Sequence, residues 1–255
     1  MKHYALIGRT LTHSLSKELF NSQHFADADY RLCPLPSLAG LREWVRRECL
    51  DGFNVTNPFK REILPLIDSL NPEAEAIGAV NCVCVKDGRL IGYNTDAPAF
   101  HQTLETSLNN KHLTINTAYI LGTGGAARAV AYALDQLGIP YVFVSRNPEK
   151  NPNAISYEEL STLSAKPTAH HNLQLSALIV NATPVGTYPD IEASPLPSDF
   201  RFSLFAFVYD LVYNPSPSLL LQQASAADAT IQDGLAMLHR QAELSWEIWG
   251  LASGR

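Results

Sequence analysis

The glycine-rich segment Gly122-Thr123-Gly124-Gly125-Ala126-Ala127 constrains the possible folds of this chain more than any other part of its sequence. The apolar run Ala118 to Leu121 precedes it and predicts a buried strand. Apolar residues at helical spacing follow from Val130 to Leu137, and Tyr141 to Val144 predicts a second strand. A strand, a glycine-rich turn, a helix and a strand in this order are typical of a dinucleotide-binding unit. We therefore predict a doubly wound, Rossmann-like domain here.

The end of the second strand bears on which dinucleotide would bind. Gly122 suits the tight turn, Gly124 would let a pyrophosphate approach the backbone, and Ala127 would pack the helix on the strand. An NAD site usually has a carboxylate at the second strand end for the ribose 2′-hydroxyl, but this chain has Ser145-Arg146-Asn147. An arginine there would pair with a 2′-phosphate and favours NADP. The alternative is an exposed arginine that only begins a loop.

Two more strands are predicted downstream, at Leu178 to Val180 and at Phe205 to Leu211, with a helix over Pro217 to Ala227. Asn181-Ala182-Thr183 and Asp210 to Asn214 would lie at the C-terminal ends of these strands. Ligands bind at that edge in doubly wound sheets, so these polar residues are candidates for the nucleotide site.

The first ninety or so residues alternate between strand-like and helix-like segments. The predicted elements are a strand at Tyr4 to Ile7, a helix at Ser16 to Phe25, a strand at Tyr30 to Cys33 and a helix from a Ser37 cap to Leu50. Such alternation predicts βαβ units on a mostly parallel sheet. Strands at Val80 to Val85 and Leu90 to Tyr93 are joined by Asp87-Gly88, a favoured hairpin turn, so this sheet should gain an antiparallel edge. A polar linker, Asn109-Asn110-Lys111, should separate this part from the nucleotide domain.

The segment Gly52 to Lys60 places one lysine at a predicted strand-to-helix junction. Phe53 to Thr56 is strand-like, and Pro58 suits the first turn of a new helix, where a missing N–H costs nothing. Lys60 would then lie in that turn, above the end of a strand. An isolated lysine is most often a solvated surface charge, so this position needs a partner before it indicates chemistry.

Charge and cysteine spacing exclude several classes of function. A net charge of -6 with no run of Lys or Arg argues against nucleic acid or an anionic membrane as the main partner and leaves small-molecule chemistry. The apolar run at Tyr4 to Ile7 is too short for a signal peptide, so we expect a cytoplasmic protein. Cys33, Cys49, Cys82 and Cys84 contain no C-x-x-C spacing, which favours reduced core thiols, and we predict no metal site.

Along nearly its whole length the chain resembles the shikimate/quinate dehydrogenase family. The matching segments are His13-Ser14-Leu15-Ser16, Gly52 to Lys60, Ala79-Val80-Asn81, Asn94-Thr95-Asp96, Gly122 to Ala127, Asn181 to Gly186, Tyr209 to Pro215, and Asp233-Gly234 through Gln241. The resemblance implies an α/β fold of two domains. Residues 1–96 with 233–255 would form the substrate-binding catalytic domain, with a mostly parallel sheet, and residues 97–232 the NADP-binding, Rossmann-like domain. The implied reaction is the reversible NADPH-dependent reduction of 3-dehydroshikimate to shikimate in aromatic amino-acid (chorismate) biosynthesis.

The resemblance also implies roles for particular residues. Lys60 would be catalytic with Asp96 as its partner, and an ammonium beside a carboxylate suits the proton transfer that accompanies alcohol–ketone interconversion. The implied substrate contacts are Ser14, Ser16, Asn54, Thr56, Asn81, Tyr213 and Gln241. The implied cofactor contacts are Gly122, Thr123, Gly124, Gly125, Ala126, Ser145, Arg146, Asn147, Asn181, Thr183 and Gly234. Two serines at a helix start suit a carboxylate, although simple capping is the alternative.

Two other functions stay open at this level. Ser145 and Asn147 replace the asparagine and threonine that the family usually has around Arg146, which keeps an NAD-using quinate/shikimate dehydrogenase in view. A catalytically silent NADP-binding regulatory protein is the second alternative, and the presence of both Lys60 and Asp96 argues against it. Phe20 stands where the family commonly has a histidine. We expect only small-molecule partners, shikimate and 3-dehydroshikimate, with no nucleic acid and no membrane, in a monomer or homodimer.

Overall fold

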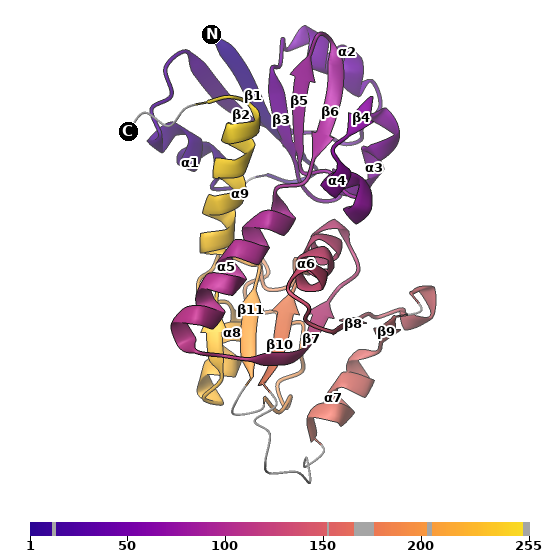
Figure 1. Cartoon of the computed structure of the whole chain (residues 1–255), viewed down its shortest axis with the longest axis vertical. Coiled ribbons are helices and arrows are strands. Elements are labelled where there is room, and N and C mark those ends of the chain that lie inside the picture. The colour runs from indigo at the N-terminus through magenta and orange to yellow at the C-terminus, as the bar shows by residue number, and fades with distance from the viewer. Residues whose placement is uncertain (12–13, 152, 166–175, 203–205, 252–255) are drawn as a thin grey trace. The chain divides into compact units, whose positions relative to one another are not determined.

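The computed structural model describes residues 1–11, 14–151, 153–165, 176–202 and 206–251. It divides into two compact units, Met1–Ala99 with His239–Arg255, and Phe100–Leu238 (Figure 1). Each unit has one six-stranded sheet with helices, so the predicted α/β class with mostly parallel sheets is confirmed. No helix in the described part of the chain is both long and apolar enough to cross a membrane.

The first unit is built on a mixed sheet with the strand order β2-β1-β3-β5-β6-β4. Its elements are β1 (Lys2–Gly8), α1 (Ser16–Ser22), β2 (Ala28–Pro34), α2 (Leu41–Arg47), β3 (Gly52–Val55), α3 (Phe59–Glu62), a 3-10 turn (Leu64–Leu66), β4 (Ser69–Leu70), α4 (Pro72–Ile77), β5 (Cys82–Lys86) and β6 (Arg89–Tyr93). Strand β1 pairs parallel with β2 and β3, whereas β5 pairs antiparallel with β3 and β6. Two helices, α5 (Asp96–Lys111) and α9 (Leu235–Ile248), begin in one unit and end in the other.

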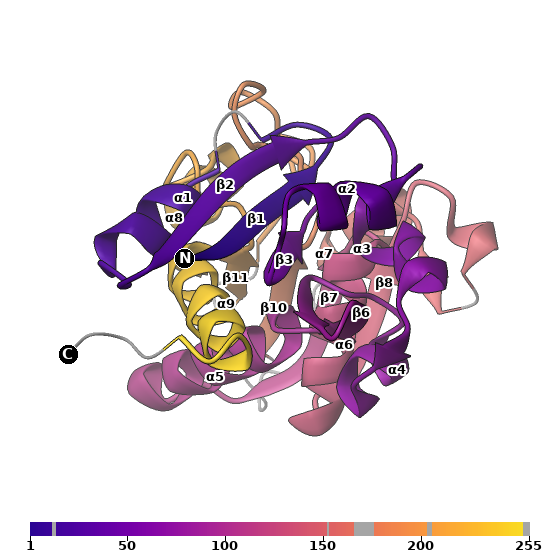
Figure 2. The ribbon, with the colours of Figure 1, turned by 90° about the horizontal axis from the view of Figure 1, so that it is seen from above.

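Alternation along the strands divides the core of this unit between the two faces of its sheet. On β1, Ala5 and Ile7 join a cluster with α2, α3 and α4, whereas Tyr4 and Leu6 join a cluster with α1 and α9 (Figure 2). Strand residues two apart share a face, so the chemistry of each face follows from the sequence. Phe53 and Val55, the neighbours of Asn54 on β3, face the cluster with α2, α3 and α4. Asn54 therefore points to the opposite face, which α9 covers.

Three local predictions, two in this unit and one in α5, differ in detail from the structure. The β5–β6 hairpin is confirmed, with Asp87 and Gly88 at positive φ, but it is internal because the two-residue β4 pairs with β6 at the edge. Ser37 does not cap α2: its Oγ accepts from the Ala39 N–H, and α2 begins after Gly40. The polar residues 109–111 form the last turn of α5 and not a linker, because polar side chains and a terminal lysine suit a helix C-terminus.

The second unit contains a fully parallel sheet with the strand order β12-β11-β10-β7-β8-β9. Its elements are β7 (Ile115–Leu121), α6 (Gly125–Gln136), β8 (Tyr141–Val144), a 3-10 turn (Pro148–Lys150), β9 (Ala154–Ile155), α7 (Tyr157–Ala165), β10 (Ser176–Asn181), β11 (Phe207–Asp210), α8 (Leu219–Ala226) and β12 (Thr230–Gln232). The predicted glycine-turn arrangement and the two later strands are therefore present, although Phe205 lies outside the described residues. The chain runs outward from β7 to β9 and then returns to β10 on the other side of β7, so β7 and β10 flank a topological switch point.

Candidate functional site

A lysine–aspartate ion pair lies at one end of β3 in the first unit. Lys60 is the second residue of α3, and its carbonyl accepts from the Val80 N–H at 2.8 Å, which fixes the lysine backbone. Its Nζ donates to Asp96 Oδ2 at 2.7 Å. The Lys60 side chain is 19% exposed and the Asp96 side chain 7%. Lys60 is therefore no ordinary surface charge: its ammonium is paired, and only part of it reaches solvent.

Asn81 holds the other oxygen of the same carboxylate. Its Nδ2 donates to Asp96 Oδ1 at 2.9 Å and to Thr95 Oγ1 at 2.8 Å. Its Oδ1 accepts from the Thr95 N–H at 2.6 Å. Both oxygens of Asp96 thus have donors, and the carboxylate plane is fixed relative to Lys60. Two segments that the resemblance named, 79–81 and 94–96, meet here.

The Asn54 amide lies next to this pair and is hydrogen-bonded within the protein. Its Nδ2 donates to Ser245 Oγ at 2.9 Å and to the Asn81 carbonyl at 3.2 Å, and its Oδ1 accepts from the Tyr30 hydroxyl at 2.8 Å. Both amide hydrogens are used, so Asn54 has at most a carbonyl lone pair for a substrate. Thr56 follows the same strand and is half-buried, and its N–H donates to the Ile7 carbonyl.

Sequence reasoning did not anticipate Tyr30 or Ser245. Ser245 lies four residues after Gln241 on α9, and its hydroxyl donates to the Gln241 carbonyl at 2.9 Å. Residues four apart share one face of a helix, so the spacing from a residue already implicated was the available signal. Tyr30 had no comparable signal, since a tyrosine on a predicted strand is ordinary core.

The two serines that were expected to hold a carboxylate are hydrogen-bonded to each other. Ser14 Oγ donates to Ser16 Oγ at 3.1 Å and accepts from the Ser16 N–H at 3.3 Å, and both residues are half-buried. Helix α1 begins at Ser16 with Leu15 as its N-cap and has no side-chain cap bond. Ser14 Oγ thus accepts from the first N–H of α1, as the capping alternative predicts, although Leu15 and not a serine is the N-cap residue. His13, in the same matching segment, lies outside the described residues.

An aromatic cluster fixes α1 and α9 on their side of the sheet. The Phe20 ring centroid lies 5.1 Å from that of Tyr30, 5.0 Å from Phe25 and 6.2 Å from Trp246. Phe20, one departure from the family pattern, is thus a buried core residue. The same contacts orient Tyr30, whose hydroxyl binds Asn54.

The predicted substrate residues are distributed unequally between the units. The six in the first unit are Ser14, Ser16, Asn54, Thr56, Asn81 and Gln241, and the seventh, Tyr213, lies in the second unit beyond β11. Hydrogen bonds join Asn54, Asn81 and Gln241, the last through its carbonyl, to one network with Lys60 and Asp96.

The second unit has a loop of the kind that binds a phosphate, at the end of β7. Gly122 has φ +102°, and a Cβ on it would lie 2.9 Å from Thr183 Cγ2, so both its backbone conformation and its contacts require glycine. Gly124 is exposed at the start of α6, and no atom lies within 4 Å of the position a Cβ would take. The twelve-residue α6 has no acidic residue in its first turn, so the free N–H groups there can receive an anion.

A buried polar cluster stabilises the neighbouring loops at this edge of the sheet. Asn181 Oδ1 accepts from the Thr183 N–H at 3.0 Å and hydroxyl at 2.7 Å, and its Nδ2 donates to Asp210 Oδ1 at 2.9 Å. Asp210 also accepts from the Val212 N–H at 2.9 Å. A Cβ on Gly234 would lie 2.2 Å from the Leu211 carbonyl oxygen, so this glycine packs directly on the loop after β11.

The residues after β8 fit a phosphate better than a ribose hydroxyl. Arg146 and Asn147 are exposed, and the Asn147 N–H donates to Ser145 Oγ at 3.1 Å in a tight turn. Burial raises the pKa of Tyr157, and the nearby positive charge of Arg146 opposes that rise, which places the guanidinium near this ring. Positions 145–147 contain no carboxylate. An open glycine loop and an exposed cation together suit a phosphorylated dinucleotide.

The buried Asp210 predicts a pH effect on stability. Burial raises the pKa of Asp210 to about 6. Hydrogen bonds from Ser218, the Val212 N–H and Asn181 act in the other direction and lower the pKa, but by less. An unfolded aspartate titrates near pH 4, so the folded state binds the proton more tightly. This stabilising contribution is complete below about pH 4 and is lost as the pH rises through about 6, a change of up to roughly 3 kcal/mol.

Asp210→Asn should remove that dependence. The unfolding free energy of wild type, measured by urea denaturation relative to the variant, should fall between about pH 4 and about pH 7. Two curves that stay parallel across this range would contradict the assignment to Asp210.

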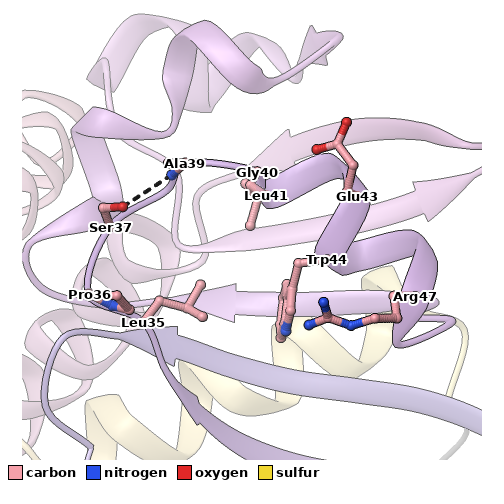
Figure 3. A pocket seen from close by; sticks show the side chains of 9 residues that line it. All are labelled: Leu35, Pro36, Ser37, Ala39, Gly40, Leu41, Glu43, Trp44 and Arg47. Carbon is pink, nitrogen blue, oxygen red and sulfur yellow. Dashed lines mark hydrogen bonds between the residues drawn. The ribbon is translucent and has the colours of Figure 1, made fainter.

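A surface hollow of about 380 Å³ lies beside α2, away from these residues (Figure 3). It is lined by Leu35, Pro36, Ser37, Ala39, Gly40, Leu41, Glu43, Trp44 and Arg47. The side chains of Trp44 and Arg47 lie close to one another, and Glu43 points away from them. None of the predicted site residues lines this hollow.

The fold and these residues define a class of protein: an α/β oxidoreductase with a nucleotide-type parallel sheet and a lysine–carboxylate pair. The family model for the shikimate dehydrogenase substrate binding domain matches residues 6–83. Relatives named shikimate dehydrogenase (NADP(+)) include one from Shouchella clausii, 34% identical over 97% of this chain and 92% of the relative, and one from Thermus thermophilus, 37% identical over 98% and 92%. The Thermus thermophilus crystal structure of shikimate 5-dehydrogenase with NADP(H) and shikimate has a TM-score of 0.80, 35% identity and coverage of 99% of this chain and 95% of that one. The chain belongs to the shikimate dehydrogenase family.

Proposed function

We propose that this chain catalyses the reversible, NADPH-dependent reduction of 3-dehydroshikimate to shikimate, a step of aromatic amino-acid biosynthesis. The observation that supports it most directly is the 2.7 Å contact between Lys60 Nζ and Asp96 Oδ2. The relatives named shikimate dehydrogenase (NADP(+)) support the same activity. A silent regulatory protein would have no need of this pair, or of an asparagine that holds the second carboxylate oxygen.

The ion pair supplies the proton half of the reaction. Reduction of a ketone adds a hydride to carbon and a proton to oxygen, and bound NADPH supplies the hydride. Lys60 would donate the proton to the carbonyl oxygen and take it back in the oxidative direction. Asp96 keeps the ammonium in one orientation, and Asn81 keeps Asp96 in place. Fixed donors of this kind need no reorganisation during the reaction.

The other predicted residues divide between the two ligands. We assign substrate binding and catalysis to residues 1–96 with 233–255, and NADP binding to residues 97–232. The loop from Gly122 to Ala126 and the start of α6 would receive the pyrophosphate, and Arg146 the 2′-phosphate. Asn181, Thr183 and Gly234 would complete the cofactor contacts.

Ser14 and Ser16 are proposed to bind the ring carboxylate, and alanine at either position tests this. Each variant should raise KM for shikimate about five- to tenfold, since one hydrogen bond is lost and water replaces part of it at these half-buried positions. KM for NADP should hardly change. A rise confined to the KM for NADP would place the serines in another site.

A steady-state assay of shikimate and quinate with NADP and with NAD tests the proposed function. Shikimate with NADP should give the highest kcat/KM of the four combinations. A preference for quinate with NAD would support the quinate-type alternative, and no turnover with any combination would support the regulatory one. We further propose a cytoplasmic monomer or homodimer. The net charge of -6 supports the absence of a nucleic-acid or anionic-membrane partner.

A further inference from the structure

A chain of buried hydrogen bonds extends from the Lys60–Asp96 pair to the C-terminal helix. Ser245, on α9, is fully buried, and Thr95 and Asn81 are 1% and 2% exposed. Ser245 Oγ lies 2.9 Å from Asn54 Nδ2 and 3.3 Å from Thr95 Oγ1. A serine inside a helix can satisfy its hydroxyl on the preceding turn alone, so these two additional contacts need a separate explanation.

The number of hydrogens fixes the direction of each bond. The single hydroxyl hydrogen of Ser245 is donated to the Gln241 carbonyl at 2.9 Å, so in the contact with Thr95 it is Thr95 that donates. Thr95 Oγ1 then accepts from Asn81 Nδ2, whose other hydrogen goes to Asp96 Oδ1. In these bonds Ser245 accepts from Asn54 and Thr95 and donates to Gln241, and the buried Cys82 thiol is a further hydrogen-bond neighbour of its oxygen. Its oxygen is the shared acceptor for Asn54 and Thr95.

Removal of that oxygen would leave two buried donors without this acceptor. One is an amide hydrogen of Asn54, which is 8% exposed, and the other is the hydroxyl of Thr95. A buried donor that loses its partner is costly, so the side chains that carry these donors would reorient to find another. Thr95 loses its acceptor directly, and a rotation of its hydroxyl would also move Asn81, because Asn81 Nδ2 donates to that hydroxyl oxygen. Asn81 is also the donor that holds Asp96.

We propose that Ser245 is a positioning residue for the reaction proposed above. Through Thr95 and Asn81 its hydroxyl sets the orientation of the Asp96 carboxylate and thereby of the Lys60 ammonium. The proposal rests on the proposed function, because it concerns the same proton transfer. It differs from a merely structural role in predicting a loss of kcat in enzyme that remains folded.

The first test is Ser245→Ala, with kcat and both KM values measured well below the melting temperature. We expect kcat to fall about five- to tenfold, because a displaced acid–base group costs a fraction of its full contribution. KM for NADP should stay within about twofold, since every residue of this chain of bonds lies in the first unit. Ser161→Ala is the matched control, because Ser161 makes the same bond to the carbonyl four residues earlier in α7, outside this network. It should leave kcat unchanged.

The second test compares two substitutions at Thr95 and does not depend on Ser245→Ala folding. Thr95→Val replaces the hydroxyl by a methyl group of similar size, whereas Thr95→Ser keeps the hydroxyl. Thr95→Ser should retain most of kcat, and Thr95→Val should lose at least as much as Ser245→Ala. Because both changes break the link between Ser245 and Thr95, the loss in the double variant Ser245→Ala/Thr95→Val should be smaller than the product of the two single losses.

The outcomes separate this proposal from the proposed function. No turnover of shikimate with NADP by wild type would overturn the function itself. An active wild type with an unchanged kcat in Ser245→Ala would overturn only the role of Ser245. Equal kcat values for Thr95→Ser and Thr95→Val, or multiplicative losses in the double variant, would also overturn it.

Discussion

Lys60→Ala should lower kcat for the reduction of 3-dehydroshikimate by roughly two to four orders of magnitude, the usual contribution of a positioned acid or base. The ammonium is held 2.7 Å from Asp96 on a side chain that is only 19% exposed, so water cannot easily take the same position with the same orientation. KM for shikimate should change much less, because the lost interaction belongs mainly to the transition state. Steady-state kinetics in both directions measure the effect.

Two further variants make this result specific. Arg61→Ala removes the exposed cation next to Lys60 on the same helix and should leave kcat within about twofold. Asp96→Asn should also lose most of the activity and change the pH dependence of kcat, because an amide cannot balance the ammonium as a carboxylate does. A near-normal kcat in Lys60→Ala would remove this residue from the catalytic role. An unchanged pH–rate profile in Asp96→Asn would count against the pair.

The fold was predictable where local sequence determines it. The strand, glycine turn and helix at 118–137 form one continuous pattern, and the structure has β7 and α6 there. The short strands β4, β9 and β12 have two or three residues each, too few for any periodicity. Their existence depends on pairing with a neighbour that is distant in sequence. The hairpin was predicted from its turn dipeptide, but β4 decided which strand lies at the edge.

The site was predictable to the extent that the family pattern names residues. Lys60 and Asp96 are 36 positions apart, and no periodicity relates them; the resemblance supplied the pairing that the structure then places at 2.7 Å. The resemblance also named Asn54 as a substrate contact, whereas its amide hydrogens bind Ser245 and the Asn81 carbonyl. Asn54 and Ser245 are 191 positions apart. A lone serine in a helix carries no sequence signal for such a contact.

Arg146→Ala should lower kcat/KM with NADP by roughly 10- to 150-fold and have almost no effect with NAD. Loss of a charged hydrogen-bond partner costs about 1.5–3 kcal/mol, and each 1.4 kcal/mol is tenfold. Only the 2′-phosphate distinguishes the two cofactors, and Arg146 is an exposed cation directly after β8, at a position where NAD sites usually have a carboxylate. Lys150, four residues further on, would add positive charge to the same loop.

The ratio of kcat/KM with NADP to kcat/KM with NAD, measured for wild type and variant, decides between the two enzymatic alternatives. The ionic strength must be the same in all assays, because salt weakens contacts between exposed charges. Arg201→Ala removes an exposed arginine from the same unit and is the control for a general loss of positive charge; its ratio should match wild type. Equal losses with NADP and NAD in Arg146→Ala would mean that the arginine supports the loop and does not read the phosphate. A wild type that uses NAD as well as NADP would overturn the assignment and favour the quinate-type enzyme. The reason is that a guanidinium binds a phosphate more strongly than it binds a ribose hydroxyl, so an arginine that contacts the cofactor should favour NADP.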